Sequence, residues 1–478
     1  MVFAPRRFVF GILAVLTTST LLIAGNGMQP RWLLMWIALL PVLSYATATG
    51  RWFAAGAAAA LSMLLGSYPM LRYIHGALHA PVSAWFVPFS IASLLFAADV
   101  LLFRALLRRG SVWSAAVAFP AFWAFVEFLA SFVPANGTAG SLAYTQLGFL
   151  QLLQLASITG QWGISFLLLL FPSALVAGVF ARRTQPRRAV GVVVAMCAVV
   201  AAALVFGAIR LSSPPVNANV RVGLLVTDSV DVADPGAPAE ELVREYAAHA
   251  EDLARRGAKI VVMPEKVAVL RNIDSPREDA PLQSVADRTG ATLVVGLLHL
   301  DPPSRFNEAR IYTPHLACRT FHKQRMLPPF ESNLTPGTSL AVLQQGTVGV
   351  AICKDMDFIR PARDYGRAGV ELMLDPAWDF EVDSAWHGHI AIMRGVENGY
   401  AIAHASKHGL LTVTDDRGRI LGEVRSRNAP FASLLVNVPM QHDSTVFSRF
   451  GAWFPWFAAV LLAVAVARLL TPGTRVAP

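Results

Sequence analysis

Long apolar stretches fill most of the first 210 residues and return near the end of the chain. A helix needs about 20 apolar residues, each rising about 1.5 Å, to cross the hydrocarbon core of a membrane. The pattern predicts about eight such helices, at about 8–25, 31–48, 52–69, 82–103, 112–133, 161–181, 189–209 and 452–470. The first stretch also fits a signal peptide, since Arg6 and Arg7 precede it and Ala24-Gly25 end it. We favour a transmembrane helix, because six further spans follow and need no separate export signal.

Residues 211–449 have a different pattern, in which short apolar strands alternate with amphipathic helices. Strands are expected near 220–226, 259–263, 292–298, 309–312, 318–322, 348–352, 370–374, 401–405, 410–414, 419–424 and 431–437, and helices near 239–256, 282–288, 360–368 and 386–398. This alternation predicts an α/β domain. We therefore expect a seven-helix membrane domain at 1–210, an extramembrane domain at 211–449, and a last membrane helix with a tail at 450–478.

Charged residues are few and unevenly placed. They make up 15% of the 478 residues, and 55% are hydrophobic, whereas a soluble domain has about 25% charged residues. A disordered chain and an ordinary cytosolic domain are therefore excluded. Outside 211–449 the chain has 15 basic residues and two acids, whereas 211–449 has 25 basic and 29 acidic residues. The net charge of +9 thus comes from short loops between apolar stretches, which is typical of membrane topology and not of nucleic-acid binding.

The arginines also predict the orientation of the helices, because cytoplasmic loops carry an excess of Lys and Arg. One alternate set of loops carries twelve arginines, and the other carries only Arg31 and Arg72. With eight spans, both termini are expected in the cytoplasm. Residues 211–449 are then expected on the opposite face, which in a Gram-negative cell is the periplasm.

Two acids fall inside predicted spans, where a charge is expensive and often functional. Asp99 lies little more than one turn before Arg104, so we expect an interfacial ion pair between them. Glu127 lies toward the outer end of its helix. It either lines a site or makes a hydrogen bond that packs the helices, and the sequence leaves both open.

Three polar residues of the α/β domain come directly after predicted strands, where such sheets place reactive groups. They are Glu265, Lys323 and Cys353. A thiol needs a nearby base or cation to act as a nucleophile at neutral pH. Glu265 can accept its proton, and the Lys323 ammonium can stabilise the oxyanion that forms on attack at a carbonyl. The three side chains suffice for acyl transfer through a thioester.

Each of these residues also has a simpler explanation. A cysteine at a strand end is more often a small buried hydrophobic residue, a glutamate there can begin a helix, and a lysine is usually solvated. Lysine is scarce, however, with five in the chain, and apolar residues at 326–330 follow Lys323. A disulfide between Cys318 and Cys353 would abolish the site and is not expected.

The histidines suggest a metal site as an alternative. His387 and His389 form one close pair, and His75 and His79 form another. Neither pair has the carboxylate or cysteine partners of a zinc site. We therefore expect no metal and no other cofactor.

The stretches around the three polar residues resemble the nitrilase, or carbon–nitrogen hydrolase, superfamily. They are Val-Val-Met-Pro-Glu ending at Glu265, Phe-His-Lys-Gln-Arg-Met-Leu-Pro-Pro-Phe-Glu around Lys323, and Val-Ala-Ile-Cys-Lys-Asp-Met-Asp-Phe around Cys353. Seven spans, such a domain and one last span together resemble the apolipoprotein N-acyltransferase family of bacterial inner membranes. The membrane part adds Phe122-Trp123 through Glu127, Tyr144-Thr145-Gln146, Leu155-Ala156 and residues 160–166 to the resemblance.

The resemblance implies a four-layer αββα sandwich and a two-step reaction without a cofactor. Cys353 would attack a phospholipid acyl ester, with Glu265 as general base and Lys323 stabilising the tetrahedral oxyanion. The thioester would then acylate the α-amino group of a diacylglyceryl-cysteine on an apolipoprotein. The Lys354 N–H would be a second oxyanion donor, and Glu331 would orient the lysine or assist proton transfer, unless it is an ordinary loop acid. The implied partners are the membrane, a phospholipid and an apolipoprotein, with no nucleic acid and a monomeric chain.

Trp378 belongs to a stretch, 374–378, that resembles an active-site loop of the family. The resemblance places its ring near the acyl chain in the substrate pocket. The alternative is that this ring packs the core.

The sequence departs from the acyltransferase pattern at several places. Lys354-Asp355 stand where the family has an aromatic residue and a glutamate, as in soluble amidases of the superfamily. Residues 136–139 replace an aromatic-rich turn, and Ala130 replaces an arginine. The segment between Lys323 and Cys353 is short. These changes leave the thioester chemistry intact and leave the acceptor open.

Two other functions are consistent with the sequence. A membrane-tethered amidase or nitrilase would use water in place of the amine. A non-catalytic scaffold or transporter would retain the domain to bind a partner. We prefer the enzyme, because a degenerate domain is expected to lose at least one of Glu265, Lys323 and Cys353.

Overall fold

The computed structural model describes residues 4–135, 137–214, 218–272 and 275–470. The chain folds into two compact units. The helical unit contains residues 1–130, 140–210 and 452–478, and the sandwich unit contains 131–139 and 211–451. A short loop from the first half of the chain therefore belongs to the sandwich unit.

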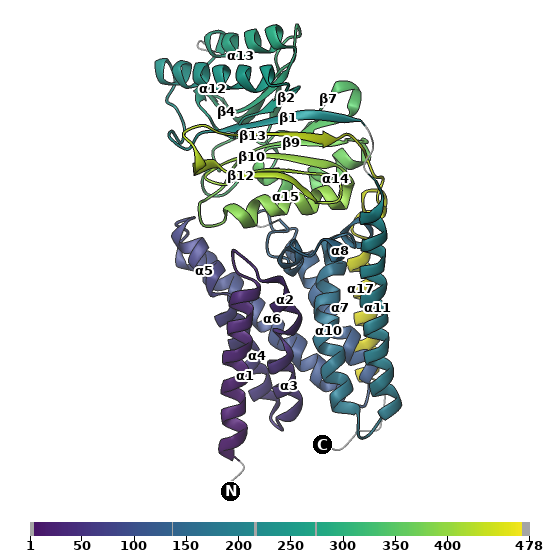
Figure 1. Ribbon diagram of the computed structural model, residues 1–478. Coiled ribbons are helices and arrows are strands. Elements are labelled where there is room, and N and C mark those ends of the chain that lie inside the picture. Colours follow the sequence, from purple (N-terminus) through teal and green to yellow (C-terminus); the bar gives the residue numbers. More distant parts are fainter. Residues whose placement is uncertain (1–3, 136, 215–217, 273–274, 471–478) are drawn as a thin grey trace. The chain divides into compact units, whose positions relative to one another are not determined.

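The helical unit consists of apolar helices (Figure 1). Within the described residues, six are long and apolar enough to cross a membrane: α1 (Ala4–Gly25), α6 (Val82–Arg108), α7 (Val112–Ala130), α10 (Gln161–Ala181), α11 (Pro186–Ser212) and α17 (Trp453–Leu470). A seventh span exists if α4 (Trp52–Gly66) and α5 (Tyr68–Gly76), which are bent by 43°, are one span. Shorter helices complete the unit: α2 (Trp32–Ile37), α3 (Leu40–Ala48), α8 (Leu150–Leu153), α9 (Ala156–Thr159) and the 3₁₀ helix η1 (Leu142–Gln146).

The count differs from the expected eight because the stretch at 31–48 is not one long helix. It forms α2 and α3, with a break between Ile37 and Leu40. Pro41 lies in the first turn of α3, and it has no N–H to donate to the carbonyl four residues earlier. The helix therefore stops and restarts at this point.

The expected ion pair between Asp99 and Arg104 is wrong. Asp99 is wholly buried, and neither carboxylate oxygen has a hydrogen-bond partner among the described residues. Arg104 instead donates to the Thr49 carbonyl at 2.7 Å. Residues five apart on a helix do not share a face, unlike those three or four apart.

Glu127 makes the helix-packing contacts that were one of its two alternatives. Its carboxylate accepts hydrogen bonds from Ser141 Oγ and Ser165 Oγ, both at 2.7 Å, and from the Leu142 N–H at 2.9 Å. These bonds join α7 to α10 and to the start of η1.

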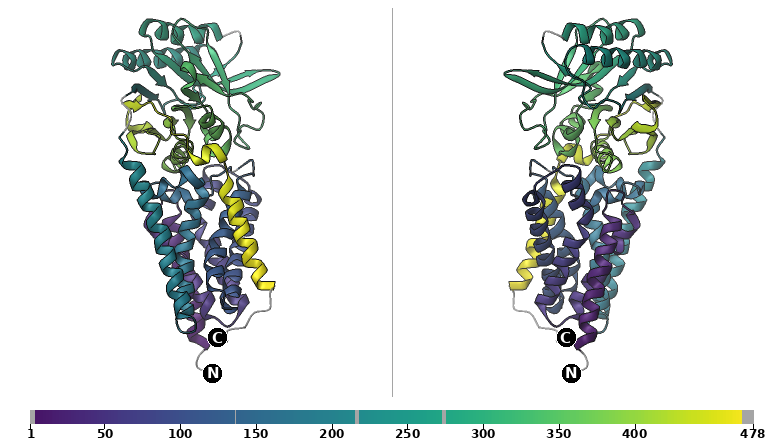
Figure 2. Two further views of the ribbon diagram at one scale, coloured as in Figure 1. Left: turned by 90° about the vertical axis from the view of Figure 1, so that its right-hand side faces the viewer. Right: turned by 90° about the vertical axis from the view of Figure 1, so that its left-hand side faces the viewer.

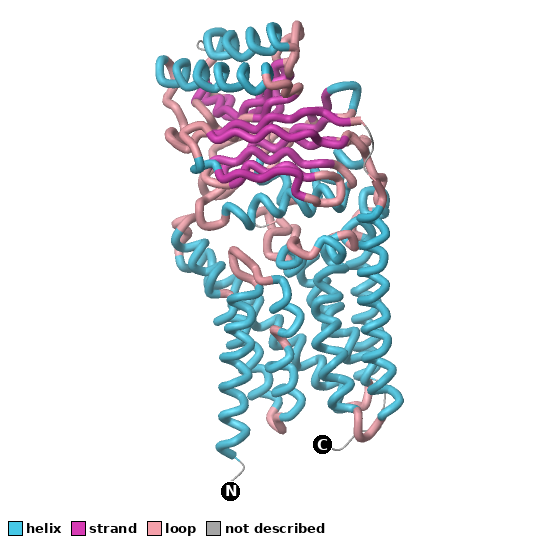
Figure 3. The backbone as a smooth tube through the Cα atoms, viewed as in Figure 1, coloured by secondary structure: helices cyan, strands magenta, loops and turns pink. Residues whose placement is uncertain are grey.

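The sandwich unit contains two β-sheets (Figure 3). One sheet has the order β13-β1-β2-β4-β5-β6, with β3 paired to β4; the strands are β1 (Asn219–Val226), β2 (Ile260–Val262), β3 (Val269–Leu270), β4 (Thr292–Asp301), β5 (Ser304–Tyr312), β6 (Arg319–His322) and β13 (Ala432–Pro439). The other has the order β12-β11-β10-β9-β8-β7, made of β7 (Ala341–Leu343), β8 (Val348–Val350), β9 (Leu372–Trp378), β10 (Ala401–Lys407), β11 (Leu410–Thr414) and β12 (Ile420–Arg425). In each sheet the central strands are parallel.

Helices cover the outer faces of the two sheets (Figures 1 and 2). The first sheet is covered by α12 (Ala237–Arg255) and α13 (Ser275–Thr289), and the second by α14 (Ile359–Arg367) and α15 (Ser384–Asn398). Short elements complete the unit: α16 (Val446–Phe450) and the 3₁₀ helices η2 (Gln344–Gly346), η3 (Cys353–Asp357) and η4 (Ser426–Asn428). A third apolar layer, which includes Leu224, Leu374 and Ala403, lies between the sheets. The predicted αββα sandwich is confirmed.

Candidate functional site

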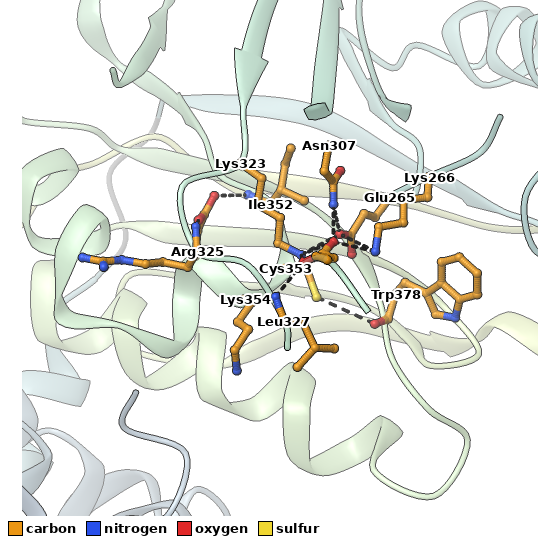
Figure 4. A network of polar contacts seen from close by, with 12 residues as sticks. Glu265, Lys266, Asn307, Lys323, Arg325, Leu327, Ile352, Cys353, Lys354 and Trp378 are labelled. Atoms are coloured by element: carbon orange, nitrogen blue, oxygen red, sulfur yellow. Dashed lines mark hydrogen bonds and ion pairs between the residues drawn. The ribbon is translucent and has the colours of Figure 1, made fainter. Parts of the chain in front are cut away.

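Glu265, Lys323 and Cys353 lie together at one place in the sandwich unit (Figure 4). Glu265 follows β2, Lys323 follows β6, and Cys353 begins η3 just after β8. The Lys323 ammonium bonds Glu265 Oε1 at 2.7 Å. The charges of Glu265 and Lys323 both act on the Cys353 thiol. Residues up to 88 positions apart are thus brought together, because β2 and β6 belong to one sheet and β8 belongs to the sheet that faces it.

The hydrogen bonds of Glu265 all fall on one carboxylate oxygen. Oε1 accepts from Lys323 Nζ at 2.7 Å and from Asn307 Nδ2 at 2.5 Å, and it lies 3.7 Å from Lys266 Nζ. Within the described chain, Oε2 has no partner. Glu265 is only 1% exposed, so its position is fixed while one oxygen stays available to accept a proton.

Gly296 on β4 leaves room for Glu265. A Cβ at this position would lie 2.5 Å from Glu265 Cα and 2.7 Å from the Pro264 carbonyl oxygen. Both contacts are shorter than non-bonded atoms tolerate, and both atoms belong to the backbone. The absence of a side chain at Gly296 therefore sets the position of Glu265.

Glu331, in contrast, has both oxygens occupied. Oε1 is 2.5 Å from Lys266 Nζ, 2.7 Å from Asn307 Nδ2 and 3.1 Å from Lys323 Nζ. Oε2 accepts from the Leu327 N–H at 2.8 Å and lies 3.0 Å from Lys323 Nζ. Although burial raises the pKa of Glu331, Lys323 and Lys266 hold it well below its usual value. Glu331 therefore remains charged and orients the lysines.

Lys323 remains protonated at the centre of this cluster. Its side chain is 2% exposed. Burial alone lowers the pKa of an ammonium, but Glu265 and Glu331 raise the pKa of Lys323 well above its usual value. The site thus holds a fixed positive charge next to the thiol.

Cys353 is held in a sharp turn. Its φ is +47°, which is uncommon for a residue with a Cβ and is found at strained functional positions. The Cys353 N–H donates to Asp375 Oδ1 at 2.7 Å, and Sγ lies 3.7 Å from the Trp378 carbonyl oxygen. Burial and the Glu265 charge raise the pKa of this thiol well above its usual value, despite the opposing effect of Lys323. The resting group is a neutral thiol, so a reaction at sulfur requires a base.

The two residues after Cys353 contribute in different ways. Within the described part of the chain, the Lys354 N–H has no hydrogen-bond partner, and its side chain pairs with Asp357 at 3.0 Å. Asp355 Oδ1 accepts the backbone N–H groups of Gln324 at 2.9 Å and Arg325 at 2.7 Å. Asp355 therefore attaches the segment after Lys323 to the turn at the cysteine. Burial raises the pKa of Asp355 to about 7, although Lys323 lowers it.

The Trp378 ring lies between two ammonium groups. Lys407 Nζ is 5.2 Å and Lys266 Nζ is 5.8 Å from its centroid, which is within cation–π range. The ring is partly exposed. Its main-chain oxygen contacts the thiol, so Trp378 belongs to the site through its backbone as well as its ring.

Sequence reasoning missed several polar neighbours of the predicted residues. Asn307 lies within β5, where asparagine is disfavoured; that mismatch was a usable signal. Asp355 was recognised only as a departure from the family pattern. Nothing in the sequence indicated that Lys266 or Asp375 belongs to the site, because the fold determines which groups a charged side chain contacts.

Comparisons with known proteins agree over most of the chain. The family model "Apolipoprotein N-acyltransferase N-terminal domain" matches residues 11–174, and "Carbon-nitrogen hydrolase" matches 235–429. An apolipoprotein N-acyltransferase of Geobacter metallireducens is 28% identical over 435 residues, covering 80% of this chain and 81% of the relative. One of Gloeobacter violaceus is 25% identical over 518 residues, covering 98% and 96%. Among solved structures, an amidase from Nesterenkonia sp. has a TM-score of 0.40 at 22% identity, covering 48% of this chain and 95% of that chain.

Proposed function

We propose that this chain, a member of the apolipoprotein N-acyltransferase family within the nitrilase superfamily, is an acyltransferase that uses a phospholipid as its acyl donor. It transfers the acyl chain to the amino terminus of a lipid-modified apolipoprotein through a thioester at Cys353. Its apolar helices make it a multi-pass membrane protein. We further propose that it resides in the bacterial inner membrane with the sandwich unit outside the cytoplasm and both termini inside, as the arginine distribution favours.

In the first step, Glu265 Oε2 accepts the proton of Cys353, and the sulfur attacks the carbonyl carbon of a phospholipid ester. The carbonyl oxygen becomes an oxyanion, which Lys323 and the Lys354 N–H stabilise. The C–O bond then breaks, Glu265 returns the proton to the leaving alkoxide, and a lysophospholipid departs. The acyl group remains on sulfur as a thioester.

In the second step, the α-amine of the lipid-modified cysteine attacks the thioester. Glu265 accepts a proton from the nitrogen, the C–S bond breaks, and the thiol is restored. One proton-accepting oxygen serves both steps. No redox change occurs, so the reaction needs no cofactor.

One observation carries this proposal: among the described residues, Glu265 has one oxygen bound by Lys323 and Asn307 and one oxygen without a partner, and its charge acts on a protonated thiol. A merely structural glutamate is expected to use both oxygens, as Glu331 does. We also propose that Trp378 borders the acyl chain, because its ring is partly exposed and its carbonyl contacts the thiol.

The test is acyl transfer by the full-length protein in liposomes containing a phospholipid with an alkyne-tagged acyl chain. We expect a hydroxylamine-sensitive adduct on the Cys353 peptide, which a diacylglyceryl lipopeptide with a free α-amine discharges. An N-acetylated lipopeptide controls for the acceptor. Cys353→Ala should abolish the adduct, and Cys318→Ala, a matched control directly before β6, should not.

Three outcomes contradict the proposal in different ways. Release of free fatty acid with no transfer to the lipopeptide indicates a hydrolase. Labelling in the Cys353→Ala variant places the thioester elsewhere. Absence of any acyl adduct on wild-type protein favours a non-catalytic role.

A further inference from the structure

A continuous line of buried charged side chains runs from one end of η3 to the other. It begins at the Cys353 N–H and passes through Asp375, His404, Asp379, His387, Asp357 and Lys354. These residues come from β9, the position directly after β9 (Asp379), β10, α15 and η3. The line therefore returns to the residue that follows the cysteine.

The first half of the line is closely spaced. Asp375 Oδ1 accepts the Cys353 N–H at 2.7 Å, and Asp375 Oδ2 contacts His404 Nδ1 at 2.7 Å. His404 Nε2 lies 3.6 Å from Asp379 Oδ2. The two carboxylates and the imidazole between them are each at most 1% exposed.

The second half closes the line at η3. Asp379 Oδ1 contacts His387 Nδ1 at 2.7 Å, and His387 Nε2 lies 3.2 Å from Asp357 Oδ1. Asp357 Oδ2 accepts from Lys354 Nζ at 3.0 Å. His387 is the most accessible member, with a side chain that is 14% exposed.

The charges along the line alternate. Burial lowers the pKa of both histidines, but their carboxylate neighbours raise the pKa of His404 to about 9 and that of His387 well above its usual value. Burial raises the pKa of Asp357, but Lys354 and His387 lower it to about 2. Each histidine therefore lies between two carboxylates, and Lys354 ends the line beside Asp357. Such alternation makes a row of buried charges tolerable, whereas one unpaired buried charge is costly.

We propose that this line of alternating charges positions the nucleophile: Asp375, held by His404, fixes the left-handed turn at Cys353, and Asp357, held by His387, fixes Lys354 so that its N–H points to the oxyanion. This inference rests on the proposed role of Cys353. The residues of the line are positioning residues, because none except Lys354 belongs to the reacting set.

The geometry of the turn explains why such support is needed. A residue with a Cβ at φ near +47° lies in a sparsely populated region, and surrounding contacts must hold it there. The Cys353 N–H bonds Asp375 Oδ1 at 2.7 Å, whereas Sγ has a weak contact at 3.7 Å. Because Asp375 already accepts this N–H, the Lys354 N–H is the donor left for the oxyanion.

The test measures the reactivity of Cys353 in the full-length protein, independently of acyl transfer. Iodoacetamide is added between pH 6 and 10, and the modified Cys353 peptide is quantified by mass spectrometry. His404→Leu removes the bond to Asp375, and His404→Asn keeps a donor near Nδ1 without a charge. His389→Asn is the matched control, because His389 lies on α15 near His404 but outside the line.

We expect the alkylation rate at pH 7.5 to change at least fivefold in His404→Leu and to return to within twofold of wild type in His404→Asn. The wild-type profile should have an inflection near pH 9 that is absent in His404→Asn. The charged neighbours of His404 are Asp375, Asp379, His387 and His389, so the inflection should persist in His389→Asn. If His404→Leu does not fold, His387→Asn replaces it in the same comparison, because His387 is the most accessible residue of the line.

The proposal is overturned if His404→Leu or His387→Asn lowers the melting temperature while the rate and pH profile of Cys353 alkylation stay those of wild type. It is also overturned if His389→Asn behaves as His404→Leu does. If wild-type protein is alkylated with the expected pH dependence but transfers no acyl group, the proposed function fails and the positioning role stands.

Discussion

Replacement of Glu331 by glutamine tests the charge balance of the site. The substitution keeps the size of the side chain but leaves two ammonium groups, the buried Lys323 and the partly buried Lys266, facing a single carboxylate, Glu265. Removal of one partner from a buried ion pair costs about 3–5 kcal/mol. In a unit of this size, about 3 kcal/mol lowers the melting temperature by about 6–12 °C.

The same change should displace Lys323, since Glu331 contacts its ammonium through both oxygens. If about 2 kcal/mol of the loss appears in the transition state, kcat/KM for acyl transfer falls about 30-fold. We expect kcat to fall more than KM rises, because in the proposed mechanism Lys323 stabilises a charge that exists only in the transition state.

The pKa of Glu331 gives a second signature. The pKa of Glu331 is lower in the folded state than in the unfolded state, where it is about 4.3. The charged carboxylate therefore stabilises the protein fully above the unfolded pKa, and this contribution is lost as the pH falls through the folded pKa. The melting temperature of wild type should therefore fall more steeply below about pH 4.5 than that of Glu331→Gln. Differential scanning fluorimetry across this range measures the difference.

Glu308→Gln is the matched control. Glu308 is also a buried carboxylate, 2.9 Å from Arg310 Nε, and it neighbours Asn307 on β5. Successive residues of a strand point to opposite faces, so Glu308 lies outside the cluster. It should lose stability but keep kcat/KM within about threefold. The reasoning is refuted if Glu331→Gln keeps kcat/KM within fivefold of wild type, or if both variants lose activity equally.

Three further predictions follow from individual contacts. Gly296→Ala should reduce acyl transfer at least 100-fold, because its Cβ would overlap the Glu265 backbone; Gly223→Ala on β1, whose Cβ meets side chains alone and none closer than 3.2 Å, should retain activity. Asp355→Asn removes a charge but keeps an acceptor for the backbone beyond Lys323; thioester formation in a single-turnover assay should slow by less than tenfold, whereas Asp355→Ala should slow it more. Burial lowers the pKa of His404, but Asp375 and Asp379 raise it to about 9. This shift stabilises the folded state fully below about pH 6.5, and the stabilisation is lost by about pH 9. The melting temperature of wild type should fall over this interval, and that of His404→Asn should not.

The sequence was sufficient to predict the layers of the sandwich and most of its strands. Strands such as β1, β10 and β11 alternate with amphipathic helices and turns. The structure has strands where this local pattern predicts them. The number of membrane-spanning helices was harder to predict, because hydropathy shows how long an apolar stretch is but not whether it forms one unbroken helix. Pro41 breaks the stretch at 31–48, so the predicted second span became two short helices.

The site was predictable in its centre but not in its surroundings. Glu265, Lys323 and Cys353 follow strands that converge, and strand order brings the three together. Their partners depend on side-chain geometry instead. His387 was considered only with His389 as a metal site, and His404 was not singled out; the folding of α15 against β10 places both His387 and His404 between carboxylates.

The choice of lysine at this site has a physical reason. The chain has 40 basic residues, of which five are lysine, and Lys266, Lys323, Lys354 and Lys407 lie at or beside the site. An arginine presents a planar fork that suits one carboxylate from one direction, whereas an ammonium is a compact charge with three donors. Lys323 has two carboxylates within 3.1 Å and, in the proposed mechanism, also faces an oxyanion, which a flat guanidinium cannot do without turning one of its edges away from a partner. A Lys323→Arg change would therefore keep the positive charge but lose this arrangement of contacts. A positive charge alone does not explain the use of lysine here.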